Sequence, residues 1–173
     1  MADDIQVLAV GDFSRFVRRS GWEYMERINV SGIVLIVPIT EDDQVVLVEQ
    51  FRIPLGKNVI EWPAGLAGDI PGCFDEPLLE AARRELLEET GYKAAEMTLL
   101  TQGPPSPALN DEILCFYLAR GLERVGEGGG DHTENIRVHL VPRANIDAWL
   151  LEKQANGILI DPKVYAGLYF LGR

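Results

Sequence analysis

A chain of 173 residues is long enough for one domain with a substantial core, and a hydrophobic fraction of 47% is typical of a globular protein. The formal net charge of −11 argues against nucleic acid and against an anionic membrane surface as partners. The only cysteines, Cys73 and Cys115, exclude a disulfide framework and a cysteine-based zinc site. Residues 1–4 are acidic and lack the basic segment of a signal peptide, and no apolar run is long enough to span a bilayer. We therefore expect a cytoplasmic protein.

The first part of the chain predicts three short strands, two of them joined as a hairpin that turns at Ser20 and Gly21. These strands cover residues 5–10, 13–18 and 22–28. Residues 1–30 contain too few apolar side chains to form a domain of their own. We interpret them as an N-terminal appendage to a main domain of residues 31–173.

The middle of the chain predicts strands on both sides of a single helix. The strands cover residues 33–40, 44–52, 59–62, 95–102 and 113–119. Residues 63–65 (Pro-Ala-Gly) end the third of these strands, and a loop is expected from there to Asp75. Residues 78–90 contain neither Gly nor Pro, which predicts a helix with Pro77 in its first turn and Gly91 at its end.

The last part of the chain predicts one more strand and two helices. They cover residues 136–141, 144–156 and 162–171. A proline-rich loop at 103–111 and a glycine-rich loop at 126–131 connect the later strands. The predicted order is strands, a central helix, more strands and then helices. This order indicates an α/β or α+β sandwich with mixed sheets.

The predicted helix at 78–90 carries its acidic residues in an unfavourable arrangement. Glu85, Glu88 and Glu89 fall within an arc of roughly 100° on one face, where they repel one another. Two of them lie in the last turn, at the negative end of the helix dipole. A solvated face with ion pairs to Arg84 is one explanation. A bound divalent cation is the better one, because Mg²⁺ and Mn²⁺ require clusters of oxygen ligands.

These acidic residues belong to a longer motif that resembles the Nudix box. Glu76, seven further residues and then Arg84-Glu85-Leu86-Leu87-Glu88-Glu89-Thr90-Gly91-Tyr92 match the pattern from its first glutamate onward. The first glycine departs from the pattern, because Ile70 stands where it should fall. Gly65 is the expected counterpart, which implies a five-residue insertion in the loop before the helix.

Segments outside the box resemble one branch of that family, the ADP-ribose pyrophosphatases and nucleoside-diphosphate-sugar hydrolases. These segments are Gln50-Phe51-Arg52, Glu61-Trp62-Pro63-Ala64-Gly65, residues 106–112, and Trp22-Glu23 with Arg27. The resemblance implies a Nudix α/β/α sandwich with mixed sheets and a small N-terminal β hairpin. It also implies that residues 1–30 serve dimerisation and substrate contact in a domain-swapped homodimer.

The resemblance further implies roles for individual residues. The carboxylates of Glu85, Glu88 and Glu89 and the carbonyl of Ala64 would hold two or three Mg²⁺ ions, with Mn²⁺ as an alternative. Arg84 would orient Glu85 and Glu88 rather than contact the substrate. The expected substrate-binding residues are Trp22, Glu23, Arg27, Arg52 and Glu112. Packing at the dimer interface is an alternative role for Trp22, in place of stacking on the nucleobase.

The family places its catalytic glutamate on a loop that here follows the glycine-rich segment 126–130. We expect Glu134 to be the general base, with Glu127 and Glu112 as alternatives. A polar loop without chemistry, in which the glycines only close a long connection, is the structural alternative.

The resulting hypothesis is Mg²⁺-dependent hydrolysis of the diphosphate of ADP-ribose or another nucleoside-diphosphate sugar, which gives a nucleoside monophosphate and a sugar phosphate. One alternative is a Nudix hydrolase of nucleoside triphosphates or dinucleoside polyphosphates. Another is a catalytically silent Nudix domain that senses nucleotides. Base and sugar preferences depend on the shapes of loops and do not follow from the motif.

Overall fold

The computed structural model describes residues 5–70, 72–130 and 134–172. Its strands are β1 (Gln6–Val10), β2 (Ser14–Arg19), β3 (Trp22–Arg27), β4 (Gly32–Pro38), β5 (Gln44–Arg52), β6 (Lys57–Glu61), β7 (Ala64–Ala67), β8 (Tyr92–Gly103), β9 (Leu114–Arg124), β10 (Ile136–Pro142) and β11 (Leu159–Ile160). Its helices are α1 (Leu78–Thr90), α2 (Ile146–Ala155), α3 (Pro162–Phe170) and the short 3₁₀ turns η1 (Ile53–Leu55) and η2 (Arg143–Asn145). In the described part of the chain, no helix combines the length and hydrophobicity needed to cross a bilayer.

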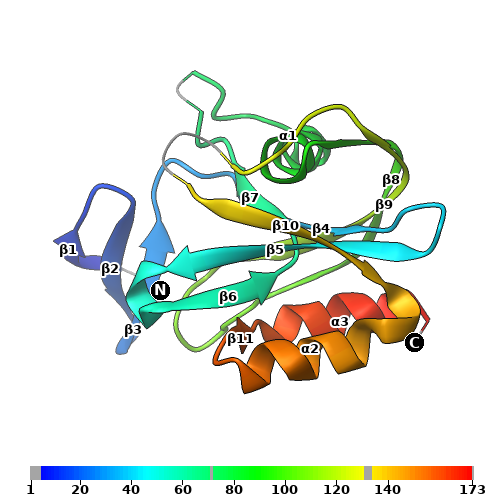
Figure 1. Cartoon of the computed structure of the whole chain (residues 1–173). Coiled ribbons are helices and arrows are strands. Elements are labelled where there is room, and N and C mark those ends of the chain that lie inside the picture. Colours follow the sequence, from blue (N-terminus) through cyan, green and yellow to red (C-terminus); the bar gives the residue numbers. More distant parts are fainter. Residues whose placement is uncertain (1–4, 71, 131–133, 173) are drawn as a thin grey trace.

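Two four-stranded sheets form the body of the molecule, and helices cover them from both sides (Figure 1). One sheet has the strand order β10-β5-β6-β11 and the other β7-β4-β9-β8. Helix α1 lies on one side of these sheets, and α2 and α3 lie on the other. Strand β4 pairs in parallel with β9 and antiparallel with β7, so the sheets are mixed. The predicted α/β/α sandwich is confirmed.

The apolar core has two parts, one on each side of the sheets. Along β4, Leu35 and Val37 belong to the part under α2 and α3, whereas Val34 and Ile36 belong to the part under α1. This alternation follows from the strand period of two residues. Because β4 is buried on both faces, its sequence is a continuous apolar run rather than an alternating one.

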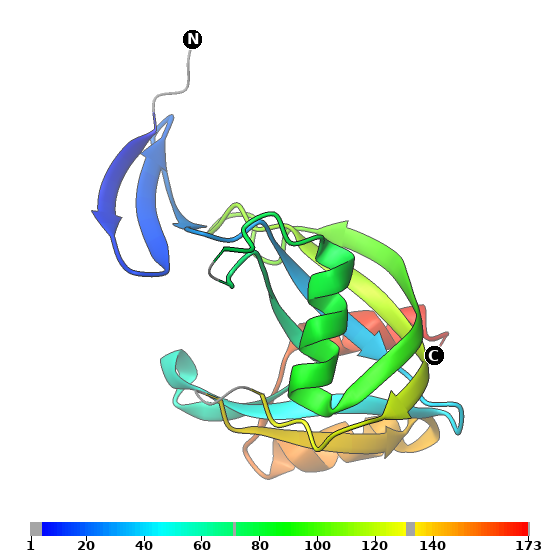
Figure 2. The same cartoon turned by 90° about the horizontal axis from the view of Figure 1, so that it is seen from above.

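Strands β1, β2 and β3 form a third sheet that projects away from the body (Figure 2). The antiparallel β2 and β3 turn at Ser20 and Gly21, which have φ angles of 51° and 82°. The predicted hairpin and the predicted strand at 5–10 are therefore both present. Phe13 and Trp22 on this part of the chain are 80% and 61% exposed, so it presents aromatic surface that this chain does not cover.

The structure corrects the predicted loop between residues 63 and 75. Ala64–Ala67 form β7, an edge strand in which Ala64 lies opposite Leu35 of β4. Alanine and glycine have weak β propensity, so no local signal marks this strand. Its pairing with β4 and its packing against α1 create it instead. Strands β8 and β9 also extend beyond the predicted bounds, because they pair with each other over most of their length.

Helix α1 spans the predicted residues 78–90. Pro77 is its N-cap residue, one position before the predicted first turn. At the other end Gly91 adopts a φ of 75°, and its N–H donates to the Leu87 carbonyl at 2.9 Å. Ala82 and Leu86 are fully buried on the face that packs on the sheet. This packing turns the adjacent acidic side of the helix toward β7.

Candidate active site

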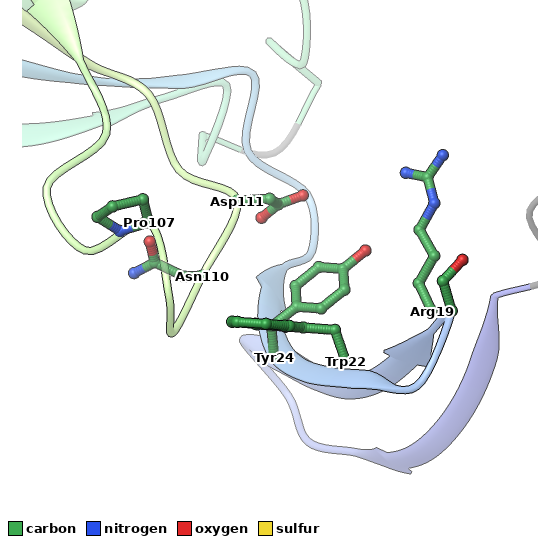
Figure 3. Close-up of a pocket in the computed structure, with 7 residues that line it drawn as sticks. Arg19, Trp22, Tyr24, Pro107, Asn110 and Asp111 are labelled. Carbon is green, nitrogen blue, oxygen red and sulfur yellow. The ribbon is translucent and has the colours of Figure 1, made fainter.

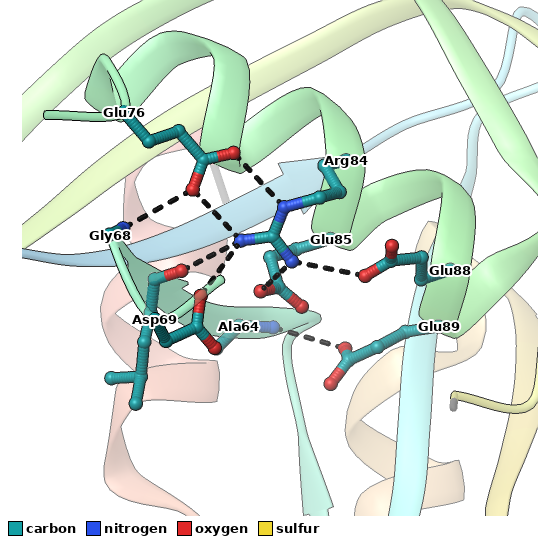
Figure 4. Close-up of polar contacts among 9 residues, drawn as sticks. Ala64, Gly68, Asp69, Glu76, Arg84, Glu85, Glu88 and Glu89 are labelled. Atoms are coloured by element: carbon teal, nitrogen blue, oxygen red, sulfur yellow. Dashed lines mark hydrogen bonds and ion pairs between the residues drawn. The ribbon is translucent and has the colours of Figure 1, made fainter. Parts of the chain in front are cut away.

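Arg84 is the central contact of the acidic cluster on α1 (Figure 4). Its guanidinium forms a bidentate pair with Glu76, with both nitrogen–oxygen distances at 3.0 Å. A third nitrogen donates to Glu85 at 2.8 Å and to Glu88 at 3.1 Å. These are the contacts that the sequence predicts for Arg84 with the two helix acids. One arginine therefore holds three carboxylates, those of Glu76, Glu85 and Glu88.

The same guanidinium also anchors the segment between β7 and α1. Arg84 Nη2 donates to the Leu66 carbonyl at 2.8 Å and lies 3.3 Å from Asp69. Glu76 accepts a further hydrogen bond from the Gly68 N–H at 3.3 Å. The hydrogen bond from Arg84 holds the pKa of Glu76 below its usual range, although burial opposes this. Glu76 therefore stays charged and holds both the arginine and the incoming loop.

Glu85 and Glu89 are buried between α1 and β7. They are only 8% and 4% exposed, respectively. The Glu85 carboxyl packs directly on Gly65, where an added Cβ would lie 2.0 Å from the Glu85 carboxyl carbon. Glu89 accepts a hydrogen bond from the Ala64 N–H at 3.1 Å. Only glycine at position 65 lets the carboxylate approach the strand this closely.

The electrostatics of this pair favour a nearby positive charge. Burial raises the pKa of Glu85 to about 7, although the charge of Arg84 acts in the opposite direction. Burial and the neighbouring Glu85 raise the pKa of Glu89 well above its ordinary value. Two buried carboxylates beside one arginine leave uncompensated negative charge when both are ionised. The oxygen-only donor set fits a hard divalent cation.

The carboxylates are at present held by protein groups. Within the described residues, no three His, Cys, Asp or Glu side chains converge closely enough to form a ready metal site. Arg84 contacts Glu85 and Glu88, and the Ala64 N–H contacts Glu89. Cation binding therefore requires these side chains to turn from their present partners.

A cavity of about 840 Å³ opens above the cluster and collects most of the predicted site residues. Its lining includes the predicted residues Arg27, Arg52, Ala64, Glu85, Glu88, Glu112 and Glu134. Glu89 is more deeply buried beside them. Three charged residues of this lining, Glu61, Asp69 and Lys163, are given no role by the sequence prediction. Lys163 comes from the first turn of α3, far along the chain, so no local pattern marks it.

Positive groups in the cavity are paired with acids of neighbouring segments. Arg52 of β5 donates to Glu61 of β6 at 2.7 Å. Arg27 of β3 forms an ion pair with Glu112, which links the projecting sheet to the loop before β9. Lys163 pairs with Asp161. The cavity thus offers three cationic side chains beside the acidic cluster.

A second cavity, of about 460 Å³, lies where the projecting sheet meets the loop before β9 (Figure 3). Trp22 and Tyr24 from the sheet face Asn110 and Asp111 from the loop. Main-chain contacts hold the two segments together, since the N–H of Met25 donates to the Leu109 carbonyl at 2.8 Å. Trp22 is thereby presented at a cavity rather than packed inside the chain.

Glu23 lies on the opposite side of its strand and pairs with Arg18. The structure therefore does not bring this predicted substrate contact to either cavity. Glu134 does line the large cavity, where it accepts a hydrogen bond from the Gln50 side chain at 3.2 Å. Asp131, His132 and Thr133, which precede Glu134 in the predicted loop, lie outside the described residues.

Comparison with known proteins shows the family of the chain. A family profile described as "NUDIX domain" matches residues 31–160. The chain belongs to the Nudix family. Residues 76–92 are therefore its Nudix box, and the family predicted from the sequence is confirmed.

Several curated Nudix relatives resemble the chain at moderate identity. The chain is 38% identical over 96 residues to an ADP-ribose pyrophosphatase of Bacillus subtilis (strain 168), covering 56% of this chain and 49% of the relative. It is 39% identical over 172 residues to a Schizosaccharomyces pombe protein named as an uncharacterized Nudix hydrolase, covering 87% and 80%. It is 32% identical to a GDP-mannose pyrophosphatase of Salmonella arizonae, covering 82% and 73%. The names of the two pyrophosphatases match the branch that the sequence resembles.

The chain spans about half the length of the Bacillus subtilis relative and of a similar Mycobacterium tuberculosis ADP-ribose pyrophosphatase. Among solved structures, a crystal structure titled as an ADP compounds hydrolase matches with a TM-score of 0.69 at 23% identity. That match covers 97% of this chain and 89% of the other. It supports the Nudix fold.

The raised pKa of Glu85 predicts how the stability of the metal-free Nudix domain depends on pH. The Glu85 carboxyl has an ordinary pKa of 4.5, which applies to the unfolded chain, and a pKa of about 7 in the folded chain. Between these pH values the folded state holds a proton that the unfolded state has lost. The free energy of unfolding should therefore fall as pH rises from 4.5 through 7. Urea unfolding in EDTA at several pH values measures this slope.

The substitution Glu85→Gln removes one of the two buried titrating groups and should reduce the slope, while Glu89 retains its part of it. Glu80→Gln, at an exposed position of the same helix, should retain the wild-type slope. An unchanged slope in Glu85→Gln would contradict the assignment of this pH dependence to Glu85.

Proposed function

We propose that this chain is a divalent-cation-dependent hydrolase that cleaves the diphosphate of ADP-ribose or another nucleoside-diphosphate sugar. The products are a nucleoside monophosphate and a sugar phosphate. The observation that carries the proposal is the pair of buried carboxylates, Glu85 and Glu89. Glu85 lines a cavity that holds three cationic side chains besides Arg84. The names of the relatives, ADP-ribose pyrophosphatase and GDP-mannose pyrophosphatase, support the substrate class.

The proposed cation ligands are the side chains of Glu85, Glu88 and Glu89 and the carbonyl oxygen of Ala64. This set would hold Mg²⁺ or Mn²⁺, with two or three ions per site. When bound, the cations neutralise the charge of the diphosphate and favour ionisation of the attacking water. Arg84 then keeps Glu76 and the rim of the site in place, because its contacts with Glu76 and Leu66 do not involve the proposed ligands.

Arg27, Arg52 and Lys163 are the proposed binding groups for the anionic substrate. Arginine forms paired hydrogen bonds with phosphate oxygens, which orients the diphosphate as well as attracting it. The net charge of −11 repels such a substrate at long range, so these local cations and the bound metal must offset that field. Hydrolysis forms one phosphorus–oxygen bond to water and breaks the bridging one, which leaves the protein little covalent work.

Glu134 is the proposed general base, which accepts the proton of the attacking water. Its carboxylate lines the same cavity as Glu85 and Glu88, and this placement supports the role. Glu112 also lines the cavity, but it is engaged by Arg27 and by Asn110 at 2.8 Å. These contacts favour Glu112 as a residue that positions Arg27 for substrate binding.

Trp22 is the proposed stacking surface for the nucleobase, on residues 1–30 that serve dimerisation and substrate contact. Three features support a domain-swapped homodimer: the sheet projects from the body, Trp22 lines a cavity, and Phe13 is 80% exposed. In such a dimer, the projecting sheet of one protomer would complete the substrate site of its partner.

Glu134→Gln should lower kcat by about 100-fold or more with little change in KM, because the amide keeps the shape of the side chain but accepts no proton. Glu127→Gln is a matched control on the exposed part of the same loop and should keep near-wild-type kcat. Steady-state kinetics of both variants on one nucleotide sugar decide between the two acids. Near-wild-type turnover in Glu134→Gln would remove it from the mechanism.

Light scattering at micromolar concentration should give about twice the chain mass of 19.2 kDa. The exposed aromatic surface of the projecting sheet would be buried in that dimer. A monomer under these conditions would contradict both the domain swap and completion of one protomer's site by its partner.

A panel of nucleoside-diphosphate sugars and nucleoside triphosphates at fixed Mg²⁺ tests the reaction itself. Products are followed by nucleotide separation, with and without EDTA. We expect a nucleoside monophosphate from at least one nucleotide sugar and loss of turnover in EDTA. Turnover of triphosphates alone would favour the other class of Nudix hydrolase, and binding without turnover on any substrate would favour the sensor.

A further inference from the structure

The glycine-rich segment 126–130 lies directly on the C-terminal end of α1. The N–H groups of Val125 and Gly126 donate to the Gly91 carbonyl at 2.9 and 3.1 Å. The N–H of Gly129 donates to the Glu89 carbonyl at 2.8 Å, and that of Gly130 to the Glu88 carbonyl at 3.1 Å. The last carbonyls of a helix have no partner within the helix. This segment supplies those partners at the two residues whose side chains are proposed cation ligands.

Glycine is required for this main-chain contact. A Cβ on Gly128 would lie 2.6 Å from the Glu89 carbonyl oxygen, and Gly128 adopts a φ of 71°. A Cβ on Gly91 would lie 2.3 Å from the Gly126 carbonyl oxygen. No side chain fits between the two segments at these points. The glycines therefore do more than close a long connection, because they let the segment seat on the helix.

Glu134 also contacts Gln50 of β5. Gln50 is only 9% exposed, and its Nε2 donates to Glu134 Oε1 at 3.2 Å. The chain after Glu134 is fixed as well, since Ile136 begins β10 directly opposite Gln50 and its N–H donates to the Gly129 carbonyl at 3.2 Å. Gly130 lies close to the same side chain, because a Cβ there would lie 2.4 Å from Glu134 Oε2.

We propose that Gln50 is a positioning residue for Glu134, and that the amides of Gly129 and Gly130 set the distance of Glu134 from the metal-binding helix. This proposal rests on the proposed role of Glu134 as general base. The side-chain contact fixes the direction of the carboxylate, and the main-chain contacts of Gly129, Gly130 and Ile136 hold the described residues on either side of it. An amide is suited to this task, since it donates a hydrogen bond without placing a full positive charge beside the base.

Gln50→Met tests the side-chain contact, because methionine has a similar length but no donor. We expect kcat to fall by about 10- to 100-fold, the scale of a small misplacement of a catalytic group, while KM stays within about twofold. Gln44→Met is a matched control. Gln44 lies on the same strand and also donates to a carboxylate, that of Asp42, but far from the cavity. It should keep wild-type kinetics.

A double-mutant cycle separates positioning from a general structural effect. In the Glu134→Gln background, Gln50→Met should cause no further loss of kcat, since its effect acts through Glu134. The same loss in both backgrounds would overturn the proposal, as would wild-type kcat in Gln50→Met. If Glu134→Gln retains near-wild-type kcat, the base assignment fails together with this proposal. If kcat falls in Glu134→Gln but not in Gln50→Met, only the positioning role of Gln50 is rejected.

Gly130→Ala and Gly126→Ala provide a second test that leaves Gln50 intact. The added methyl at position 130 would meet Glu134, whereas at position 126 the nearest atom lies 3.8 Å away. We expect kcat to fall by about tenfold or more in Gly130→Ala and to stay within about twofold of wild type in Gly126→Ala. Thermal unfolding confirms that each variant is folded. Equal kcat in the two variants would overturn the main-chain part of the proposal.

Discussion

The contact between α1 and β7 is the constraint on which the other features of the site depend. Glu85 and Glu89 are buried against Ala64 and Gly65, so two carboxylates lie where desolvation opposes their charge. Arg84 compensates part of this charge, and its pKa is raised in turn by the neighbouring acids. The proposed divalent cation would compensate the rest. The stability of the apo fold and the affinity for a cation are therefore linked through the same two side chains.

This linkage explains why the helix is held so firmly at both ends. Near its beginning, the Glu76–Arg84 pair ties it to the segment after β7. At its end, the glycine-rich segment satisfies the carbonyls of Glu88 and Glu89. Amide N–H groups at this end also offset the unfavourable position of two acids at the negative end of the helix dipole. A helix that carries buried like charges needs such contacts to hold its carboxylates in place.

The sequence predicts some of these elements well and others not at all, for physical reasons. The bounds of α1 follow from local signals, namely an interior without Gly or Pro and a terminal Gly91. Strand β7 is not marked in the sequence, because Ala64 and Gly65 have no strand preference and the strand depends on its pairing with β4 and its contact with α1. The residues of the site also divide into those that the sequence predicts and those that it does not. The helix acids carry a motif, whereas Lys163 reaches the site only through tertiary packing.

The clamp formed by Arg84, Glu76 and the Gly68 N–H has a consequence for how this site could diversify. The Arg84 guanidinium holds both the Leu66 carbonyl and the Glu76 carboxylate, and the Gly68 N–H donates to Glu76. The segment between Gly68 and Glu76 is therefore a loop whose ends are held together whatever its length. For such a loop, a doubling in length costs only about 0.6 kcal/mol of closure entropy. Insertions here could change the rim of the cavity while the positions of the helix carboxylates stay unchanged. The five-residue insertion that the resemblance to the Nudix box implies would fall in this segment, where added length costs the fold little.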